Sequence, residues 1–239
     1  NPFVNFLNCN TWFHQSYIAD ISEKWDLYTK NHVKNKILND NQRQIRRLEK
    51  IGNVKFLIPN TVNDKDLILK ILFKQKREKY SKTKVWDMLA KKENREFYTQ
   101  IVKKNINSEC FEVHLSCLKI KNEIIAAHLG FIKDKTFYYI MPSFDIYKWN
   151  KFSPGKILLE YLIKWSIEKN LKYFDFTYGN EPYKLIWSNK KITLYEFIEY
   201  NNFFGILYIL LQNFILIIKN NNFLKKKIGF LYNQIKNYI

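Results

Sequence analysis

Helical periodicity dominates the chain between residues 40 and 105. Apolar residues recur there at intervals of three or four, and lysine and arginine occupy the remaining faces. Four elements are predicted in this part: a helix capped by Asp40 and ended by Gly52, a strand over 54–58, a helix capped by Asn63 or Asp64, and a helix over about 93–105.

From residue 111 onward the period changes to two, which is typical of strands. Three consecutive strands are predicted over 111–120, 124–132 and 136–141, joined by short polar turns as in an antiparallel meander. A strongly periodic helix over about 153–170 then leads to a strand over 172–177. Because a strand, a helix and a strand in this order nearly always form a right-handed parallel crossover, the last two strands should be parallel neighbours. A final strand is expected over 192–200.

These elements predict a mixed α/β (α+β) fold, with a mostly antiparallel sheet flanked by helices and a helical C-terminal tail. We divide the chain into a lead-in segment over 1–40, a main domain over 41–200 and a basic helical tail over 201–239. The chain starts at Asn1 without a methionine or a signal peptide, so we expect it to be part of a longer protein.

Composition sets limits on the classes of partner. The chain is 46% hydrophobic and 17% aromatic, enough for a sizeable core. Its net charge of +18 would ordinarily favour nucleic acid or anionic membrane as a partner. However, 35 of its 40 basic residues are lysine, and arginine is the better bidentate reader of phosphates and bases. A solvated lysine surface is therefore the main alternative.

The tail over 201–239 carries five lysines and no acidic residue. Its apolar stretch over 203–218 is shorter than the roughly 20 residues that a membrane span needs, so no transmembrane helix is predicted. Two interpretations remain: helices packed on the sheet or on the absent upstream part, and an interfacial helix pair with lysines toward anionic lipid. We expect a cytoplasmic protein, with contact at the inner face of the membrane under the second interpretation.

The first segment suited to chemistry is Ser153-Pro154-Gly155-Lys156, where the sheet passes the chain to a helix. Ser153 is placed to cap, Pro154 fits the first helical position, and Gly155 would let a ligand approach the amides. Helix N-termini bind phosphates, and Lys156 adds a charge. The alternative is an ordinary well-capped helix.

The second segment runs from Asp175 to Trp187, at the C-terminal end of the predicted parallel strand, where open α/β sheets bind ligands. It contains Glu181, Tyr183 and Lys184, candidates for acid, base and charge-binding roles. A carboxylate on a buried strand needs a partner or a function, so Asp175 could instead accept amides from the following loop. Glu181, Tyr183 and Lys184 could equally form a surface turn with an incidental ion pair.

His128 lies on the apolar strand of the meander, within Ala126-Ala127-His128-Leu129-Gly130. A lone histidine in a core is more often a hydrogen-bonded core residue than a catalytic one. The remaining histidines and the three cysteines show no metal-ligand spacing, so no metal is expected. Ser153 lacks the surroundings of a serine-hydrolase nucleophile.

Three segments together resemble the GNAT-fold acetyltransferase family associated with cellulose and exopolysaccharide biosynthesis, which is similar in turn to the Fem-type peptidyltransferases. They are 126–130, 153–159 and 174–187, and the resemblance covers roughly residues 42–200. A basic helix with Arg43, Arg46 and Arg47 also matches the family. Members commonly have two GNAT-like halves, and the resemblance implies that this chain holds the second half.

The resemblance implies transfer of an acyl group from acyl-CoA, such as acetyl-CoA, to an amine of a sugar or cell-envelope precursor. Ser153, Gly155 and Lys156 would bind the donor phosphates. The catalytic candidates are Glu181, Tyr183, Lys184, Asp175 and His128. A carboxylate or the histidine would take the amine proton, and Tyr183 would protonate the leaving thiolate. The predicted phosphate corner has one glycine, fewer than the general GNAT loop.

Two other classes of function stay open. A Fem-like transferase would take its acyl group from aminoacyl-tRNA, which would give the +18 charge a use. The other is a catalytically silent binding module, because a fold does not guarantee a complete site.

Overall fold

The computed structural model describes residues 14–104, 111–194 and 202–220. His14–Leu194 form one compact unit, and the described part of the tail belongs to a second. The first unit contains, in chain order, β1 (His14–Asp20), α1 (Trp25–His32), α2 (Asn35–Glu49), β2 (Val54–Leu57), α3 (Val62–Thr83), α4 (Lys92–Lys103), β3 (Glu112–Ile120), β4 (Glu123–Lys133), β5 (Thr136–Phe144), α5 (Pro154–Glu168), β6 (Tyr173–Tyr178), α6 (Pro182–Trp187) and β7 (Lys190–Leu194).

The seven strands form one sheet in the order β2-β3-β4-β5-β6-β1-β7. All neighbouring pairs are antiparallel except β5 and β6, which are parallel and joined through α5. The predicted meander, the crossover helix and the mixed, mostly antiparallel sheet are therefore confirmed.

The segment before residue 40 contributes a strand to the sheet. β1 lies between β6 and β7 and pairs with both, for example Ile18 with Asp175 and with Lys190. Tyr17, Ala19 and Ile21 are buried. The expected lead-in is thus part of the main body, and the boundary placed at residue 40 falls inside α2. The expected last strand is β7, which begins at Lys190; residues 195–200 lie outside the described part.

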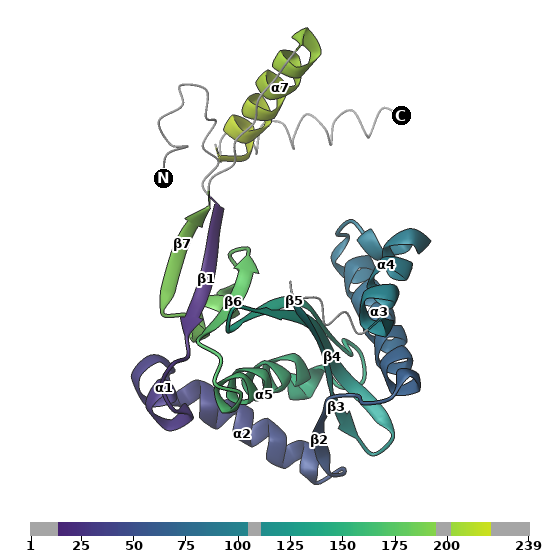
Figure 1. The fold of residues 1–239 in the computed structure, drawn as a ribbon, viewed down its shortest axis with the longest axis vertical. Helices are drawn as coiled ribbons and strands as arrows, with labels where there is room; N and C mark the ends of the chain where they lie inside the picture. The colour runs from purple at the N-terminus through teal and green to yellow at the C-terminus, as the bar shows by residue number, and fades with distance from the viewer. Residues whose placement is uncertain (1–13, 105–110, 195–201, 221–239) are drawn as a thin grey trace, which may run out of the picture. The chain divides into compact units, whose positions relative to one another are not determined.

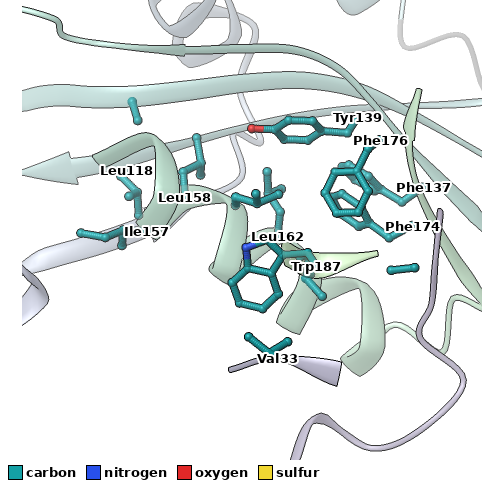
Figure 2. Close-up of a cluster of buried hydrophobic side chains, with 14 of the residues drawn as sticks. Val33, Leu118, Phe137, Tyr139, Ile157, Leu158, Leu162, Phe174, Phe176 and Trp187 are labelled. Atoms are coloured by element: carbon teal, nitrogen blue, oxygen red, sulfur yellow. The ribbon is translucent and has the colours of Figure 1, made fainter. Parts of the chain in front are cut away.

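Helices cover both faces of the sheet: α2 and α5 lie on one side, and α3 and α4 on the other (Figure 1). β3 shows how alternation serves both layers. Leu118 and Ile120 are in the core under α5, whereas Leu115 and Cys117 are in the core under α3. Figure 2 shows the first core, where the rings of Phe137, Phe174 and Phe176 gather beside Leu162 of α5.

Two helix starts differ from the expected ones. α2 begins at Asn35, and Asp40 lies inside it, where its carboxylate accepts a hydrogen bond from Arg43 at 2.9 Å. α3 is capped by Thr61, whose hydroxyl accepts the backbone N–H of Asp64 at 3.1 Å. Thr61 caps α3 with its own hydroxyl, whereas α2 begins after Lys34, which makes no side-chain capping hydrogen bond.

The tail contributes α7 (Phe203–Asn220), close to the apolar helix expected over 203–218. None of the described helices combines the length and apolar content that crossing a bilayer requires. The basic helix expected over 224–239 falls outside the described residues. The contact with anionic lipid through 201–239 stays a prediction.

Candidate active site

The parallel strands β5 and β6 lie side by side only over their first halves. Their pairing runs from Thr136 with Tyr173 to Tyr138 with Asp175, although β5 continues to Phe144 and β6 to Tyr178. The separation begins beside a register shift in the β4–β5 ladder, where β5 has one residue more than β4. Beyond this point the backbone of β5 has no β6 partner in the ladder.

Gly130, the last residue of the 126–130 segment, lies opposite this bulge. A Cβ atom there would lie 2.6 Å from the carbonyl oxygen of Tyr138 and 2.6 Å from Cε1 of His128. A side chain at this position would therefore push the bulge and the histidine apart. The spacing of His128 and Gly130 in the sequence reflects this close packing.

Asp175 holds the backbone at the end of β6. Its Oδ1 accepts hydrogen bonds from the Ser16 hydroxyl at 2.9 Å and from the Thr177 N–H at 2.7 Å. Thr177 has φ of 59°, a costly conformation for a β-branched residue that needs such support. The carboxylate thus accepts a backbone amide near the end of its own strand, whereas the sequence had suggested amides of the following loop.

Lys184 closes the loop that follows. Its side chain is 3% exposed, and its Nζ donates to the carbonyl of Tyr178 at 2.6 Å and to Oε2 of Glu181 at 2.9 Å. Gly179 has φ of 125°, and a Cβ there would collide with the Glu181 carboxylate. The loop is built around the Lys184–Glu181 pair.

Glu181 is ionised at neutral pH. Partial burial acts to raise the pKa of its carboxyl, but the hydrogen bond and charge of Lys184 outweigh burial, so that the pKa lies below its usual value. A carboxylate with a lowered pKa is a weaker base than a free one. Its partner Lys184 is buried, whereas the Glu181 side chain is 54% exposed and open to a substrate.

Tyr183 is protonated at neutral pH, because burial raises the pKa of its phenol and the charge of Glu181 adds to this. Its ring contacts Tyr139 of β5 edge to face, with centroids 6.3 Å apart. Tyr139 in turn stacks on the imidazole of His128 at 4.4 Å. A row of rings therefore connects the β6–α6 loop with His128 inside the sheet.

His128 is fully buried, and neither ring nitrogen has a hydrogen-bond partner among the described residues. Burial, followed by the nearby His114 and Lys76, lowers its pKa well below the usual value, so the imidazole is neutral. It is not the hydrogen-bonded core histidine that the sequence suggested as the alternative. Its contacts are aromatic, with Phe137 and Tyr139.

The start of α5 brings Ser153, Gly155 and Lys156 together, with Pro154 in the first turn as expected. The Ser153 side chain does not cap the helix, because Ser153 adopts a left-handed conformation with φ of 51°. The N–H of Lys156 already donates to the Ser153 carbonyl at 2.9 Å. A Cβ at Gly155 would lie 2.8 Å from the ring of Phe144, so the glycine allows α5 to pack closely on β5.

Lys76 of α3 is a residue that the sequence did not single out. It is half-buried, and its Nζ donates to the carbonyl of Pro142 on the unpaired part of β5 at 3.2 Å. Its pKa is lowered to about 8, chiefly by burial and also by the charge of Lys79, while the charge of Glu181 acts in the opposite direction. Only the packing of α3 on the sheet places this lysine here, since several lysines of the helix have the same sequence pattern. Within the described parts of the chain, His, Cys, Asp and Glu form no group that could hold a metal ion.

A family model for the acetyltransferase (GNAT) domain matches residues 35–185. The chain belongs to this GNAT acetyltransferase domain family. The match begins at the first residue of α2 and includes the separating strands, the start of α5 and the β6–α6 loop. No curated protein matches the sequence.

Solved structures show the same fold at low sequence identity. FemX superposes with a TM-score of 0.53 at 10% identity, over 75% of this chain and 61% of FemX. A conserved protein of unknown function from Bacteroides thetaiotaomicron VPI-5482 superposes with a TM-score of 0.54 at 14% identity, over 81% of this chain and 63% of that one. The chain therefore spans about three fifths of these structures.

Proposed function

We propose that this GNAT domain transfers an acyl group from acyl-CoA to an amine of a sugar or other cell-envelope polysaccharide precursor. The observation that carries the proposal is the separation of β5 and β6 next to a loop that holds an ionised carboxylate and a protonated phenol. An unpaired strand edge offers backbone hydrogen-bonding groups to an acyl donor, and acyl transfer needs one group to accept a proton and one to donate it.

The reaction divides among these groups as follows. The acceptor amine attacks the thioester carbonyl, the carbon–sulfur bond breaks, and the amine loses a proton. Glu181 is the proposed acceptor of that proton, directly or through water, with His128 as the second candidate. Tyr183 gives its proton to the leaving thiolate. Lys184 keeps Glu181 ionised and the loop closed, and Asp175 supports the backbone beneath.

The donor phosphates are assigned to the first turn of α5. Ser153, Gly155 and Lys156 lie at a helix N-terminus, where the helix dipole favours anions. Because Gly155 is packed against Phe144, a substitution there would disturb the fold as well as a ligand. Lys156 is exposed, so Lys156→Met is the cleaner test of donor binding.

The second candidate is a Fem-like transferase that takes its acyl group from aminoacyl-tRNA. It is favoured by the net charge of +18, which suits a polyanionic donor. A silent binding module remains the third. All three use the same fold, so they differ in the donor that is bound and consumed.

In the test, the full-length protein is incubated with acetyl-CoA or with aminoacyl-tRNA, together with amino-sugar acceptors. The product is followed by mass spectrometry. We expect acetylated amine from acetyl-CoA, and loss of about 100-fold in kcat for Glu181→Gln. Glu168→Gln is the matched control, because Glu168 is exposed at the end of α5. Product from aminoacyl-tRNA alone would establish the second candidate, and no product from either donor would favour the silent module.

A further inference from the structure

Helix α3 carries basic side chains on two faces, and the two faces differ in how the charges are balanced. The side facing α4 lines a groove of about 780 Å³. Most of its cations have carboxylate partners, as in Arg77 with Asp87 at 2.8 Å and Lys103 of α4 with Asp66 at 3.0 Å. Those charges are largely neutralised within the protein.

The other basic face consists of Lys76, Lys79 and Lys82, which we call the α3 lysine row. Each ammonium lies over an aromatic ring: Lys76 over Tyr80 at 5.4 Å, Lys79 over Phe144 at 5.3 Å and Lys82 over Tyr147 at 5.8 Å. No carboxylate of the described residues forms an ion pair with any of the three. The row is therefore held in place but not neutralised.

The row lies beside the proposed active site. Lys76 is bonded to Pro142 on the unpaired part of β5, and the ring under Lys79 is the Phe144 ring against which Gly155 packs. One aromatic ring thus separates Lys79 from the first turn of α5. Residues six apart on a helix are about 9 Å apart along its axis, a length that accommodates two or more adjacent phosphate groups.

We propose that the α3 lysine row binds the phosphate groups of a small phosphorylated substrate of the acyl-transfer reaction. Lysine binds phosphate as a compact point charge, and three of them in a row, none in an ion pair with a described carboxylate, attract a chain of negative groups. The ligand's identity rests on the proposed function, since either the donor or a phosphorylated acceptor supplies this chemistry. The row itself rests on the observed geometry.

The test measures binding of inorganic pyrophosphate and of coenzyme A by calorimetry at about 0.1 M salt. The variant is Lys79→Met/Lys82→Met, which leaves the more buried Lys76 in place. Its control is Lys70→Met/Lys74→Met, which removes the same charge from the same helix on the side facing α4. We expect the Kd for pyrophosphate to rise tenfold or more in the first variant and less than about twofold in the control, with Lys79→Arg/Lys82→Arg retaining binding.

The two sources of the phosphates give different results. If the row serves the donor, pyrophosphate displaces coenzyme A and both affinities fall together. If it serves the acceptor, coenzyme A binds the variant normally and is not displaced. Equal weakening in both double variants, or no pyrophosphate binding at all, would overturn the proposal. So would row-dependent binding of RNA alone.

Failure of this proposal and failure of the proposed function can be distinguished. If the enzyme is active and the row variants keep every KM unchanged, the proposed phosphate site is wrong and the proposed acyl transfer is retained. If pyrophosphate binding depends on the row but the protein is inactive with either donor, the phosphate site is retained and the proposed transferase activity is wrong.

Discussion

Polar side chains have hydrogen-bond or ion-pair partners around the loop after β6, whereas several in the interior of the sheet under α5 have none among the described residues. At the end of β6 and in the turn into α6, Asp175, Glu181 and Lys184 all have partners within 3 Å. Under α5, the buried side chains of His114, Ser116 and His128 leave four polar atoms without a partner among the described residues. The two regions are connected by the rings of Tyr139 and Tyr183.

This difference shows that a charged or titratable residue type does not by itself indicate a catalytic role. The loop charges hold a strained backbone in place, as the positive φ angles of Thr177 and Gly179 require. The interior histidines are held neutral and lower stability, because a buried polar group without a partner costs about 1–3 kcal/mol. Tyr183 lies between these two regions, and in the part of the chain that the structure describes its hydroxyl has no structural role in either of them.

The largest effect is expected at that connection. Tyr183→Phe removes the proton donor but keeps the ring that packs on Phe176 and Tyr139, so kcat should fall about 100-fold or more while the melting temperature is nearly unchanged. Tyr139 contacts the Tyr183 ring but is not a proposed proton donor, so Tyr139→Phe should lower kcat less than tenfold. Equal losses in the two variants would show that packing, and not the Tyr183 proton, matters.

Lys184→Met tests the loop as a structural unit. It leaves the Tyr178 carbonyl and the Glu181 carboxylate without their donor, so we expect a loss of about 2–3 kcal/mol in the free energy of unfolding. The control is Lys190→Met, which breaks an exposed ion pair with Asp20 and should cost at most about 1 kcal/mol. Denaturant unfolding of both variants measures the difference, and similar small losses would contradict the structural role.

The interior should respond to acid. Burial lowers the pKa of His114 to about 3, and in the unfolded chain its pKa is near 6.5. The unfolded state therefore binds a proton below about pH 6.5 that the folded state does not. The contribution of His114 to stability should be constant above pH 6.5 and fall by about 1.4 kcal/mol for each pH unit below it, until pH nears 3, and the buried His128 adds a fall in the same direction.

His114→Leu should reduce the slope of the free energy of unfolding against pH by about 1.4 kcal/mol per pH unit, the contribution of one proton. Urea unfolding between pH 7 and pH 4.5 measures this slope. The control is His32→Gln, which removes a half-exposed imidazole and leaves the interior of the sheet unchanged. An unaltered slope in His114→Leu would mean that the imidazole is hydrated or paired in solution.

The smallest effect is expected at Asp175. Asp175→Asn keeps an oxygen to accept the Ser16 hydroxyl and the Thr177 N–H but weakens both bonds, so we expect a loss of about 1 kcal/mol. Asp175→Ala, which removes the acceptor, should cost about twice as much. If Asp175→Asn instead abolished turnover with stability intact, the carboxylate would have to be placed in the reaction.

Much of the order of the elements was readable from local pattern. The meander β3–β4–β5, the crossover helix α5 and the parallel strand β6 are contiguous in the chain, so period-two and period-3.6 patterns and the handedness rule were sufficient to predict them. The positions of Gly130 and Gly155 were also visible, although the reason for each is a close contact that only the structure shows.

The tertiary structure alone decided how distant segments meet. β1 was not predicted as a strand of the sheet, because its partners β6 and β7 lie more than 150 residues later. The same distance hid the Ser16–Asp175 hydrogen bond. Lys76 looks like its neighbours in the sequence and differs from them in its hydrogen bond to the Pro142 carbonyl of β5. A local pattern determines which face of an element is apolar, whereas the burial, partners and pKa of a single side chain depend on what that face meets.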